Sequence, residues 1–409
     1  MLYEQIGNKW MVGVLWNRIG ANFRTWGKFD AAQSAFDNAI EIADELGDQV
    51  FIRPLVLTNK AIMRMDQGIS WSETEQFLRS ARDLMRQSGN MPNYSIVLET
   101  LGRLLARAGK WDEAEAIAAE YSRYAQRIKD RIEMAFAQRM QAELALLRIE
   151  AGISSCEQQK YQILTLTEFE SELAVDYPYE TADLWIFKAE YALLCGDLKD
   201  AQEKIEYALE LYTQEQPESF IGPKLREVRA RILASVNRKT EACADFKKSQ
   251  HLQADYFLRG HAFYCYAKAF PEDLEASENM KAALQCFESL PAAWLAYEAW
   301  LFLNPEVDMM GITPETYKQL WIALLRCGPF AIDSALQEVF EDKSLAPWRD
   351  RLPQASSPSH RVQQTIAFLF QQRADNGENM LAVFLRCLSR LEYMGDACRG
   401  ELLQLANKL

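Results

Sequence analysis

The chain has 409 residues, and its 45 lysines and arginines against 58 acidic residues give a net charge of −13. With 49% hydrophobic and 25% charged residues, the composition is that of a folded globular protein and excludes wholesale disorder. A sequence-independent grip on nucleic acid needs a row of cations. The acidic balance therefore argues against a nucleic-acid-binding protein and against one that binds an anionic membrane surface.

The eight cysteines are scattered and form neither a CxxC motif nor a zinc-ligand spacing. We expect all of them to be small buried residues in a reducing compartment: Cys156, Cys195, Cys243, Cys265, Cys286, Cys327, Cys387 and Cys398. The N-terminus has Glu4 and no apolar core, which is unlike a signal peptide. The longest apolar stretch, Trp294–Leu303, is too short to span a bilayer. These features predict a water-soluble, cytoplasmic protein.

Apolar residues recur at helical spacing along nearly the whole chain, and sustained period-two alternation is absent. Good helix formers, including Ala, Leu, Glu, Gln, Arg and Lys, dominate the composition. The sequence therefore predicts an all-α fold.

An internal repeat begins near Trp16, where Gly20 is expected to let two helices approach closely and Gly27 to form the turn between them. The second helix then alternates large and small residues at Phe29, Ala32, Phe36 and Ala39. The small residues of successive first helices are Gly20, Ala61, Gly102, Ala145, Ala189 and Ala230, spaced 41, 41, 43, 44 and 41 residues apart. A second marker, Gly7, Gly47 and Gly89, repeats after 40 and 42 residues.

This pattern resembles the tetratricopeptide repeat, in the long-helix variant found in bacterial signalling proteins. The resemblance covers residues 1–250 and implies a right-handed α-solenoid whose concave surface holds a protein or peptide. Residues 251–330 continue as degenerate repeats or capping helices.

Residues 331–409 read as short helices separated by sharp breaks at proline and glycine. They resemble a small death-fold-like helical bundle, and more specifically the bacterial effector-associated domains. The residues that carry the resemblance are Leu336, Phe340, Leu345, Trp348, Leu352, Arg361, Ile366, Leu369, Asn379, Leu381, Phe384, Leu385, Leu388, Gly395, Asp396, Leu402, Leu403 and Leu409. The resemblance implies an adaptor that recruits an effector enzyme by like-to-like pairing. The alternative is that this segment only caps the solenoid.

Motifs for nucleophilic, nucleotide-dependent or zinc-dependent catalysis are missing from the sequence. His251, His261 and His360 are the only histidines. Cys265 follows His261 at i+4, but the aromatic neighbours of this pair favour a place in the core. We therefore predict a protein that is not an enzyme and has no catalytic residues, metal site or cofactor.

The repeat register places a set of polar and apolar residues on the inner wall of the solenoid. The predicted partner-binding groove contains Asn17, Arg24, Thr58, Met65, Glu99, Arg103 and Arg107. Its arginines can bind carboxylates in a bidentate manner, or they can pair with acidic residues of the next repeat. Asn17 matches one position of the family's carboxylate clamp, but the accompanying lysine is absent.

The C-terminal bundle is expected to recruit its partner through charged faces. The predicted adaptor surface sets Arg361, Arg373, Arg386 and Arg390 against an acidic patch of Asp333, Glu338, Glu341 and Asp342. The sequence thus predicts an interaction scaffold or sensor that works in a bacterial conflict, defence or signalling system. One alternative is a peptide-binding receptor that controls a transcription factor or an enzyme, which requires a closed superhelix with an enclosed pocket. Another is an enzyme with an unusual site.

Overall fold

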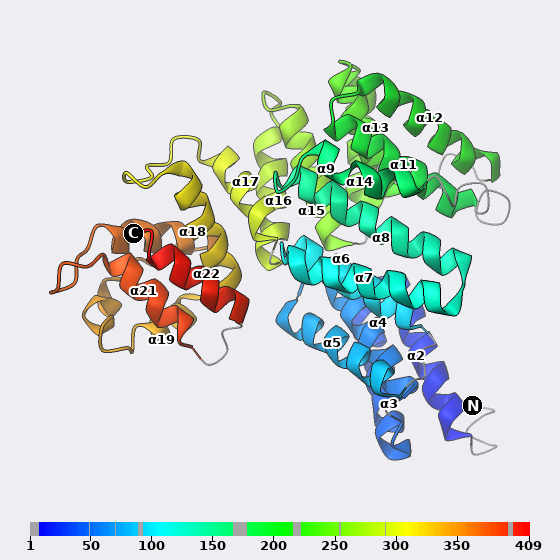
Figure 1. Cartoon of the computed structure of the whole chain (residues 1–409), viewed down its shortest axis with the longest axis horizontal. Coiled ribbons are helices and arrows are strands. Elements are labelled where there is room, and N and C mark those ends of the chain that lie inside the picture. The colour runs from blue at the N-terminus through cyan, green and yellow to red at the C-terminus, as the bar shows by residue number, and fades with distance from the viewer. Residues whose placement is uncertain are drawn as a thin grey trace. The chain divides into compact units, whose positions relative to one another are not determined.

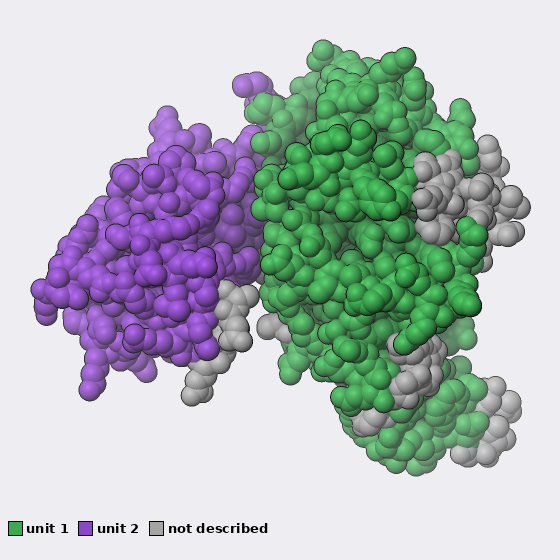
Figure 2. Space-filling model, viewed as in Figure 1, with its two compact units in different colours: residues 1–271 green, residues 272–409 purple. Residues whose placement is uncertain are grey.

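The structure is a computed structural model, and in the part that it describes the regular secondary structure is helical, apart from an isolated bridge between Arg373 and Asn379 (Figure 1). The described residues are 8–48, 50–69, 71–88, 93–166, 178–215, 222–252, 255–290, 292–391 and 396–409. The all-α prediction is confirmed for these residues. The chain divides into two compact units, unit 1 (Met1–Pro271) and unit 2 (Glu272–Leu409) (Figure 2). The domain boundaries predicted from the sequence lie instead near residues 250 and 330.

Unit 1 consists of helices that pack as neighbouring pairs, followed by one further helix. The pairs are α2 (Lys9–Thr25) with α3 (Phe29–Leu46), α4 (Ile52–Gln67) with α5 (Trp71–Ser88), α6 (Tyr94–Arg107) with α7 (Trp111–Ile128), α8 (Arg131–Glu150) with α9 (Cys156–Leu164), α11 (Pro178–Leu194) with α12 (Leu198–Glu215), and α13 (Pro223–Ser235) with α14 (Lys239–Leu252). The first helix of each pair contacts the first helix of the next, which forms one continuous layer from α2 to α13.

Small residues allow the two helices of a pair to pack closely. A Cβ atom on Gly20 would lie 2.5 Å from the Phe36 ring, so the predicted close approach of the first two helices is confirmed. Gly27 turns the chain with a φ of 69°, which is the left-handed region that favours glycine. Asn237 takes the same role between α13 and α14. Of the second glycine marker, Gly47 caps α3, whereas Gly7 and Gly89 lie outside the described residues.

Large and small side chains alternate along the buried face of the second helices, as the repeat predicts. The buried residues include Ala32, Phe36 and Ala39 in α3, Ala114, Ala118 and Tyr121 in α7, Ala201, Ile205 and Ala208 in α12, and Ala242, Phe246 and Ser249 in α14. Burial of these apolar groups against the first helices is the main stabilising contribution within each pair.

Helix α15 (Tyr256–Ala269) ends unit 1 and returns to the early repeats. It packs on α13 and α14 and also contacts α4. A Cβ atom on Gly68, at the end of α4, would lie 2.3 Å from the Tyr256 ring. The start of α15 is therefore fitted closely against a helix about two hundred residues earlier in the chain, and residues 256–269 belong to the same body as the repeats.

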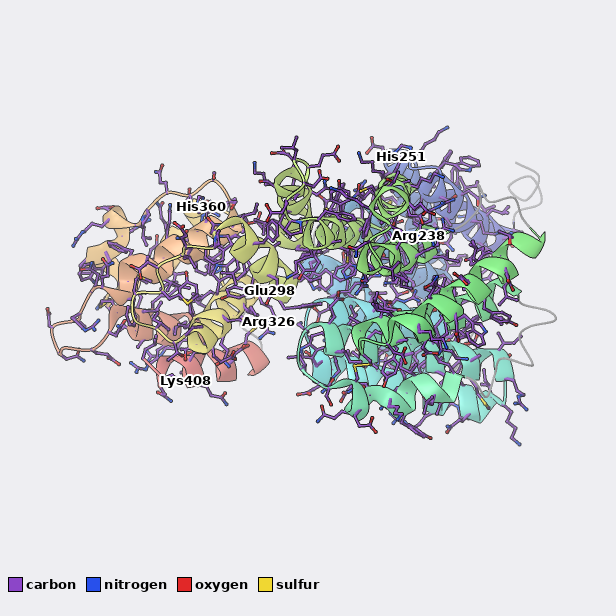
Figure 3. All side chains as sticks on the ribbon, turned by 90° about the horizontal axis from the view of Figure 1, so that it is seen from above. Arg238, His251, Glu298, Arg326, His360 and Lys408 are labelled. Carbon is purple, nitrogen blue, oxygen red and sulfur yellow. A yellow bond between two sulfur atoms is a disulfide. The ribbon has the colours of Figure 1, made fainter. Side chains whose placement is uncertain are left out.

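Unit 2 is built around aromatic side chains. Its helices are α16 (Ala276–Ser289), α17 (Ala293–Leu303), α18 (Pro314–Cys327), α19 (Asp333–Val339), α20 (Pro358–Phe370), α21 (Met380–Ser389) and α22 (Asp396–Ala406), with a 3₁₀ turn at Ala346–Arg351. Its fully buried residues include Tyr317, Trp321, Phe330, Phe340 and Phe384. Arg326, labelled in Figure 3, forms an ion pair with Glu401 and so joins α18 to α22. Gly395 lies outside the described residues. In the part of the chain that the structure describes, every helix is too short or too polar to cross a membrane.

The expectation that all eight cysteines are buried and reduced is wrong for five of them, because four form disulfides and Cys243 is only partly buried. The structure has disulfides between Cys156 and Cys195 and between Cys327 and Cys398, with Cα atoms 5.8 Å apart in each. Cys195 is exposed, because it follows the last residue of α11 at the turn into α12. These pairings depend on where helix ends meet in space, which the scattered spacing of the cysteines does not indicate.

Candidate functional site

Charged side chains join the first helices of successive repeats into what we call the inner ladder. Arg24 binds Asp66 at 3.0 Å, and Arg103 Nε donates to Glu143 at 2.7 Å. The further rungs are Arg139 with Glu99 at 2.6 Å, Arg139 with Asp183 at 3.4 Å, and Arg231 with Glu190 at 2.7 Å. The partners are 42, 40, 40, 44 and 41 residues apart, which is the period of the repeat. The inner ladder therefore links α2 to α4, and it joins α6, α8, α11 and α13 in succession.

Two arginines of the predicted groove, Arg24 and Arg103, belong to the inner ladder, and the third, Arg107, binds Asp255 at the start of α15. Arg24 and Arg103 both pair with acidic residues of the next repeat, which is the second of the two possibilities that the sequence left open. Glu99 binds both Arg103 and Arg139. A bidentate contact between these arginines and a partner's carboxylate would therefore have to compete with an existing ion pair.

The remaining predicted groove residues are buried. Asn17 accepts a hydrogen bond from the Asn59 amide at 3.0 Å, and Thr58 donates to the Pro54 carbonyl at 2.7 Å. Met65 packs in the core cluster of repeats two to four. These three side chains offer little surface to a partner, and their role in partner binding stays a prediction.

A cavity of about 250 Å³ lies within unit 1, lined by residues of α6, α8, α11, α13 and α15. Three of these helices present the same order of side chains along the cavity: a charged residue, two apolar residues, then another ionisable residue. The series are Glu143, Leu146, Leu147 and Glu150 in α8, Asp183, Ile186, Phe187 and Glu190 in α11, and Asp255, Phe257, Leu258 and His261 at the start of α15. The cavity therefore has charged residues at both ends of an apolar middle.

Arg107 and Asp255 hold the start of α15 over the cavity. Arg107 is only 4% exposed, and it donates to Asp255 at 2.7 Å and stacks on the Phe257 ring at 4.7 Å. Asp255 also caps α15 by accepting from the backbone amides of Phe257 and Leu258. One carboxylate thus begins the helix and fixes its position against α6.

His261 lies at the other end of the cavity, between two carboxylates. Its Nδ1 is 2.9 Å from Glu227 and its Nε2 is 3.0 Å from both oxygens of Glu150. Cys265 Sγ lies 3.7 Å from Nδ1 and 3.9 Å from Nε2. The predicted burial of His261 and Cys265 is confirmed, but their acidic partners on α13 and α8 were not predicted. One signal was present, since Glu227 occupies the register position that Ile186 fills one repeat earlier.

The charges around His261 shift its pKa and those of its neighbours. Burial lowers the pKa of His261, but Cys265, Glu150 and Glu227 outweigh this and raise the pKa well above 6.5. Burial raises the pKa of Glu150, yet His261 and Arg231 bring it down to about 2. The pKa of Glu227 falls for the same reasons, with Lys224 as the largest attractive charge. An imidazolium held by two carboxylates is the charge state that fits this site when no metal ion is bound.

In unit 2, two of the predicted adaptor arginines are engaged within the unit. Arg361 is 4% exposed, pairs with Asp333, and donates to the backbone carbonyls of Phe330 and Ala355. It therefore fixes the segment before α19 and offers little surface. Arg386 is half-buried and pairs with Glu378.

The other predicted adaptor residues are exposed, namely Glu338, Glu341, Asp342, Arg373 and Arg390. Glu341 pairs with Arg349 at 3.4 Å, and Arg373 donates to the carbonyl of Phe370 at the end of α20. Hydrogen bonds from Ser344, together with the nearby Arg390, lower the pKa of Asp342. The structure thus brings Asp342 and Arg390 near each other, and these exposed charges are the candidate contact residues of unit 2.

Comparison with known proteins identifies only the C-terminal part of the chain. A family model described as Bacterial Death-like domain 1 matches residues 309–408, from just before α18 through α22. This confirms the death-fold-like part of the prediction, although the match begins well before residue 331. Curated proteins yield no match to the chain. The family match does not reach the helix pairs of unit 1, so their assignment as tetratricopeptide repeats stays a prediction. Residues 309–408, about a quarter of the chain, are therefore similar to the bacterial Death-like domains, which are protein-interaction modules.

Proposed function

We propose that this chain is a non-enzymatic signalling scaffold that uses its Death-like region to recruit a partner protein. The observation that carries the proposal is the family match over residues 309–408. The partner is proposed to be an effector enzyme, and the helical array of unit 1 to be the part that senses or holds a second protein or peptide.

The exposed charges of unit 2 support recruitment through a polar surface. Arg373 and Arg390 are exposed in the matched region, as are Glu338 and Glu341. Charged surfaces steer encounter and set partner choice, and reversing a rim charge changes association more than stability. Arg361 is excluded from this surface by its burial.

The proposal can be tested in the full-length chain with charge-reversed variants. Partners captured from the source cell by the wild type would be compared, by quantitative mass spectrometry, with those captured by the double variant Arg373→Glu, Arg390→Glu. We expect one specific partner to be lost from the variant. The affinity of that partner for the purified double variant should be at least tenfold lower than its affinity for the purified wild type.

Lys281→Glu provides the matched control. Lys281 is an exposed cation of unit 2 that lies in α16, outside the matched region. Loss of the same partner from this control, or full retention by the double variant, would contradict recruitment through the predicted surface.

A second candidate function is a receptor for a small ligand or a short peptide, and the cavity of unit 1 favours it. The sequence analysis expected such a receptor to close its superhelix around a pocket. Helix α15 contacts α4, pairs with α6 through Arg107, and reaches α8 through His261. A ligand with a charged group at either end and an apolar middle would match the order of side chains that lines the cavity.

The receptor function can be tested by filling the cavity. Leu147→Trp would place a bulkier side chain among the residues that line the cavity, whereas Ile128→Trp lies on the exposed surface of α7. Native mass spectrometry of protein purified from the source cell should show a bound small molecule in the wild type and in Ile128→Trp, but not in Leu147→Trp. An empty wild type, or a ligand retained by Leu147→Trp, would argue against the cavity as a binding site.

A further inference from the structure

The wall of the cavity carries a group of potential metal ligands that neither function uses. Glu150, His261 and Cys265 present a carboxylate, an imidazole and a thiol whose ligand atoms all lie within 4.8 Å of one another. We propose that Glu150, His261 and Cys265 form a zinc site.

The geometry of His261 and Glu150 suits a shared metal ion. Nε2 and the Glu150 oxygens are 3.0 Å apart. Zn–N and Zn–O bonds of about 2.0–2.2 Å place two such ligands roughly 3 Å apart across a tetrahedral ion. Because Glu150 and His261 line the cavity, the open coordination position would face it and take a water molecule.

Cys265 supplies the sulfur ligand from the same face of α15. It follows His261 by four residues, so the two side chains lie one helical turn apart. Its Sγ is almost equally far from both ring nitrogens, at 3.7 and 3.9 Å. Coordination beside Nε2 therefore requires the Cys265 side chain to rotate about its Cα–Cβ bond toward Glu150.

Glu227 occupies the supporting position that zinc-bound histidines use. It is fully buried and lies 2.9 Å from His261 Nδ1, on the opposite side of the ring from Glu150. A carboxylate that accepts from the second ring nitrogen fixes the tautomer and makes Nε2 the metal ligand. The other Glu227 oxygen, Oε2, accepts no hydrogen bond from the described residues.

The charges around the site balance when a divalent ion replaces two protons. Glu150, Glu190 and Glu227 carry three negative charges, against Lys224 and Arg231 and the imidazolium of His261. With zinc bound, the imidazole is neutral and the Cys265 thiolate adds one negative charge, so the ion's two positive charges restore neutrality. A mixed nitrogen, sulfur and oxygen ligand set is one that Zn²⁺ accepts, whereas Mg²⁺ and Ca²⁺ prefer oxygen alone.

The test uses Co²⁺ as a spectroscopic probe in the full-length, metal-free protein under nitrogen. Tetrahedral Co²⁺ absorbs in the visible range, and a thiolate ligand adds a sulfur-to-cobalt charge-transfer band in the near ultraviolet. We expect both features at one Co²⁺ per chain, and their loss on addition of one equivalent of Zn²⁺. Cys265→Ser should remove the charge-transfer band, whereas Cys243→Ser, which changes another free thiol of unit 1, should retain it.

Two further variants keep the test independent of how well Cys265→Ser folds. Glu150→Gln should weaken Co²⁺ binding by removing a ligand, and Glu227→Gln should weaken it about 10–100-fold by removing the supporting carboxylate. The proposal is overturned if the wild type shows no tetrahedral cobalt spectrum, if Cys265→Ser keeps the charge-transfer band, or if Glu150→Gln and Glu227→Gln bind as tightly as the wild type.

Discussion

Units 1 and 2 are both helical, yet they bury different kinds of residue. Among the described residues, unit 1 buries Arg107, Lys188, Glu190, Arg226, Glu227, Asp245 and His261, whereas the charged side chain buried in unit 2 is Arg361. Buried charges are costly unless they are paired. Unit 1 accepts that cost along the inner ladder and around its cavity, while unit 2 has an aromatic core and keeps most of its charges on the surface. The difference is consistent with the proposed functions, in which unit 1 binds a ligand in its interior and unit 2 binds a partner at its surface.

The largest expected effect comes from removing one partner of a buried pair in unit 1. Arg107→Met should destabilise unit 1 by about 3–5 kcal/mol, because it leaves Asp255 without its cation and removes the stacking on Phe257. Hydrogen exchange should accelerate most in residues 255–269. Arg79→Met is the control, since Arg79 is 37% exposed and its loss should cost about 1 kcal/mol or less. Equal effects of the two substitutions would contradict the conclusion that Arg107 holds the start of α15 against α6.

The disulfide of unit 2 should matter next. Cys327→Ser should destabilise unit 2 by about 2–4 kcal/mol, because Cys327 and Cys398 join α18 to α22 across 71 residues of sequence. Cys195→Ser in unit 1 should cost less, since it opens a 39-residue loop at an exposed turn. Urea unfolding with and without reductant measures both. If reductant leaves the wild type and both variants equally stable, the disulfides do not form in the protein.

A matched pair of glycine substitutions should have opposite signs in the two units. Gly20→Ala should destabilise unit 1 by about 1–3 kcal/mol, because its methyl group would lie 2.5 Å from the Phe36 ring. Gly400→Ala should stabilise unit 2 by about 0.5–1 kcal/mol, since it lies within α22 with open space around it. Thermal unfolding of the two variants measures the difference, and a neutral Gly20→Ala would contradict close helix packing in the first pair.

An effect of similar size to that of Gly400→Ala is expected on the pH dependence of unit 1. Burial, with a further contribution from Asp255, outweighs the attraction of Arg24 and Arg107 and raises the pKa of Asp66 to about 6. A carboxyl with a raised folded pKa binds its proton more tightly when folded, so stability rises as pH falls from 7 to 5, by about 1 kcal/mol for this group.

Other carboxylates of unit 1 act in the opposite direction at lower pH. Burial raises the pKa of Glu143, but Arg103 and Arg107 outweigh it, so its pKa lies below the ordinary 4.5. Its contribution is present above pH 4.5 and is lost below that value. Unit 1 should therefore be most stable near pH 5. Asp66→Asn should reduce the change between pH 7 and 5 in a series of urea titrations, and the remainder should come from His261, whose raised pKa acts in the same direction. An unchanged slope in this variant would show that other groups control it.

Helical class and repeat period followed directly from residue spacing, because Gly20, Gly27 and the alternating Ala32, Phe36 and Ala39 act within one helix pair. The closure by α15 did not, since Arg107 and Asp255 are 148 residues apart and their meeting depends on the summed rotation of every repeat.

The candidate sites, too, could be predicted only where their residues contact each other within one repeat or between neighbouring repeats. Arg103 and Glu99 were placed on the inner wall by register, whereas Glu150 and Glu227 reach His261 only in the closed array. In unit 2, the sequence identified the death-fold-like bundle but not the burial of Arg361. Besides Asp333, Arg361 binds the backbone carbonyls of Phe330 and Ala355, and no side-chain pattern encodes such contacts.

The most direct test of this account is hydrogen exchange on the full-length chain with and without the partner that it captures. We expect slower exchange on binding in peptides of residues 309–408 that contain Glu338, Glu341, Arg373 or Arg390. The Arg373→Glu, Arg390→Glu variant should show no change. Protection confined to unit 1, with exchange in residues 309–408 unaltered, would contradict recruitment through the Death-like region.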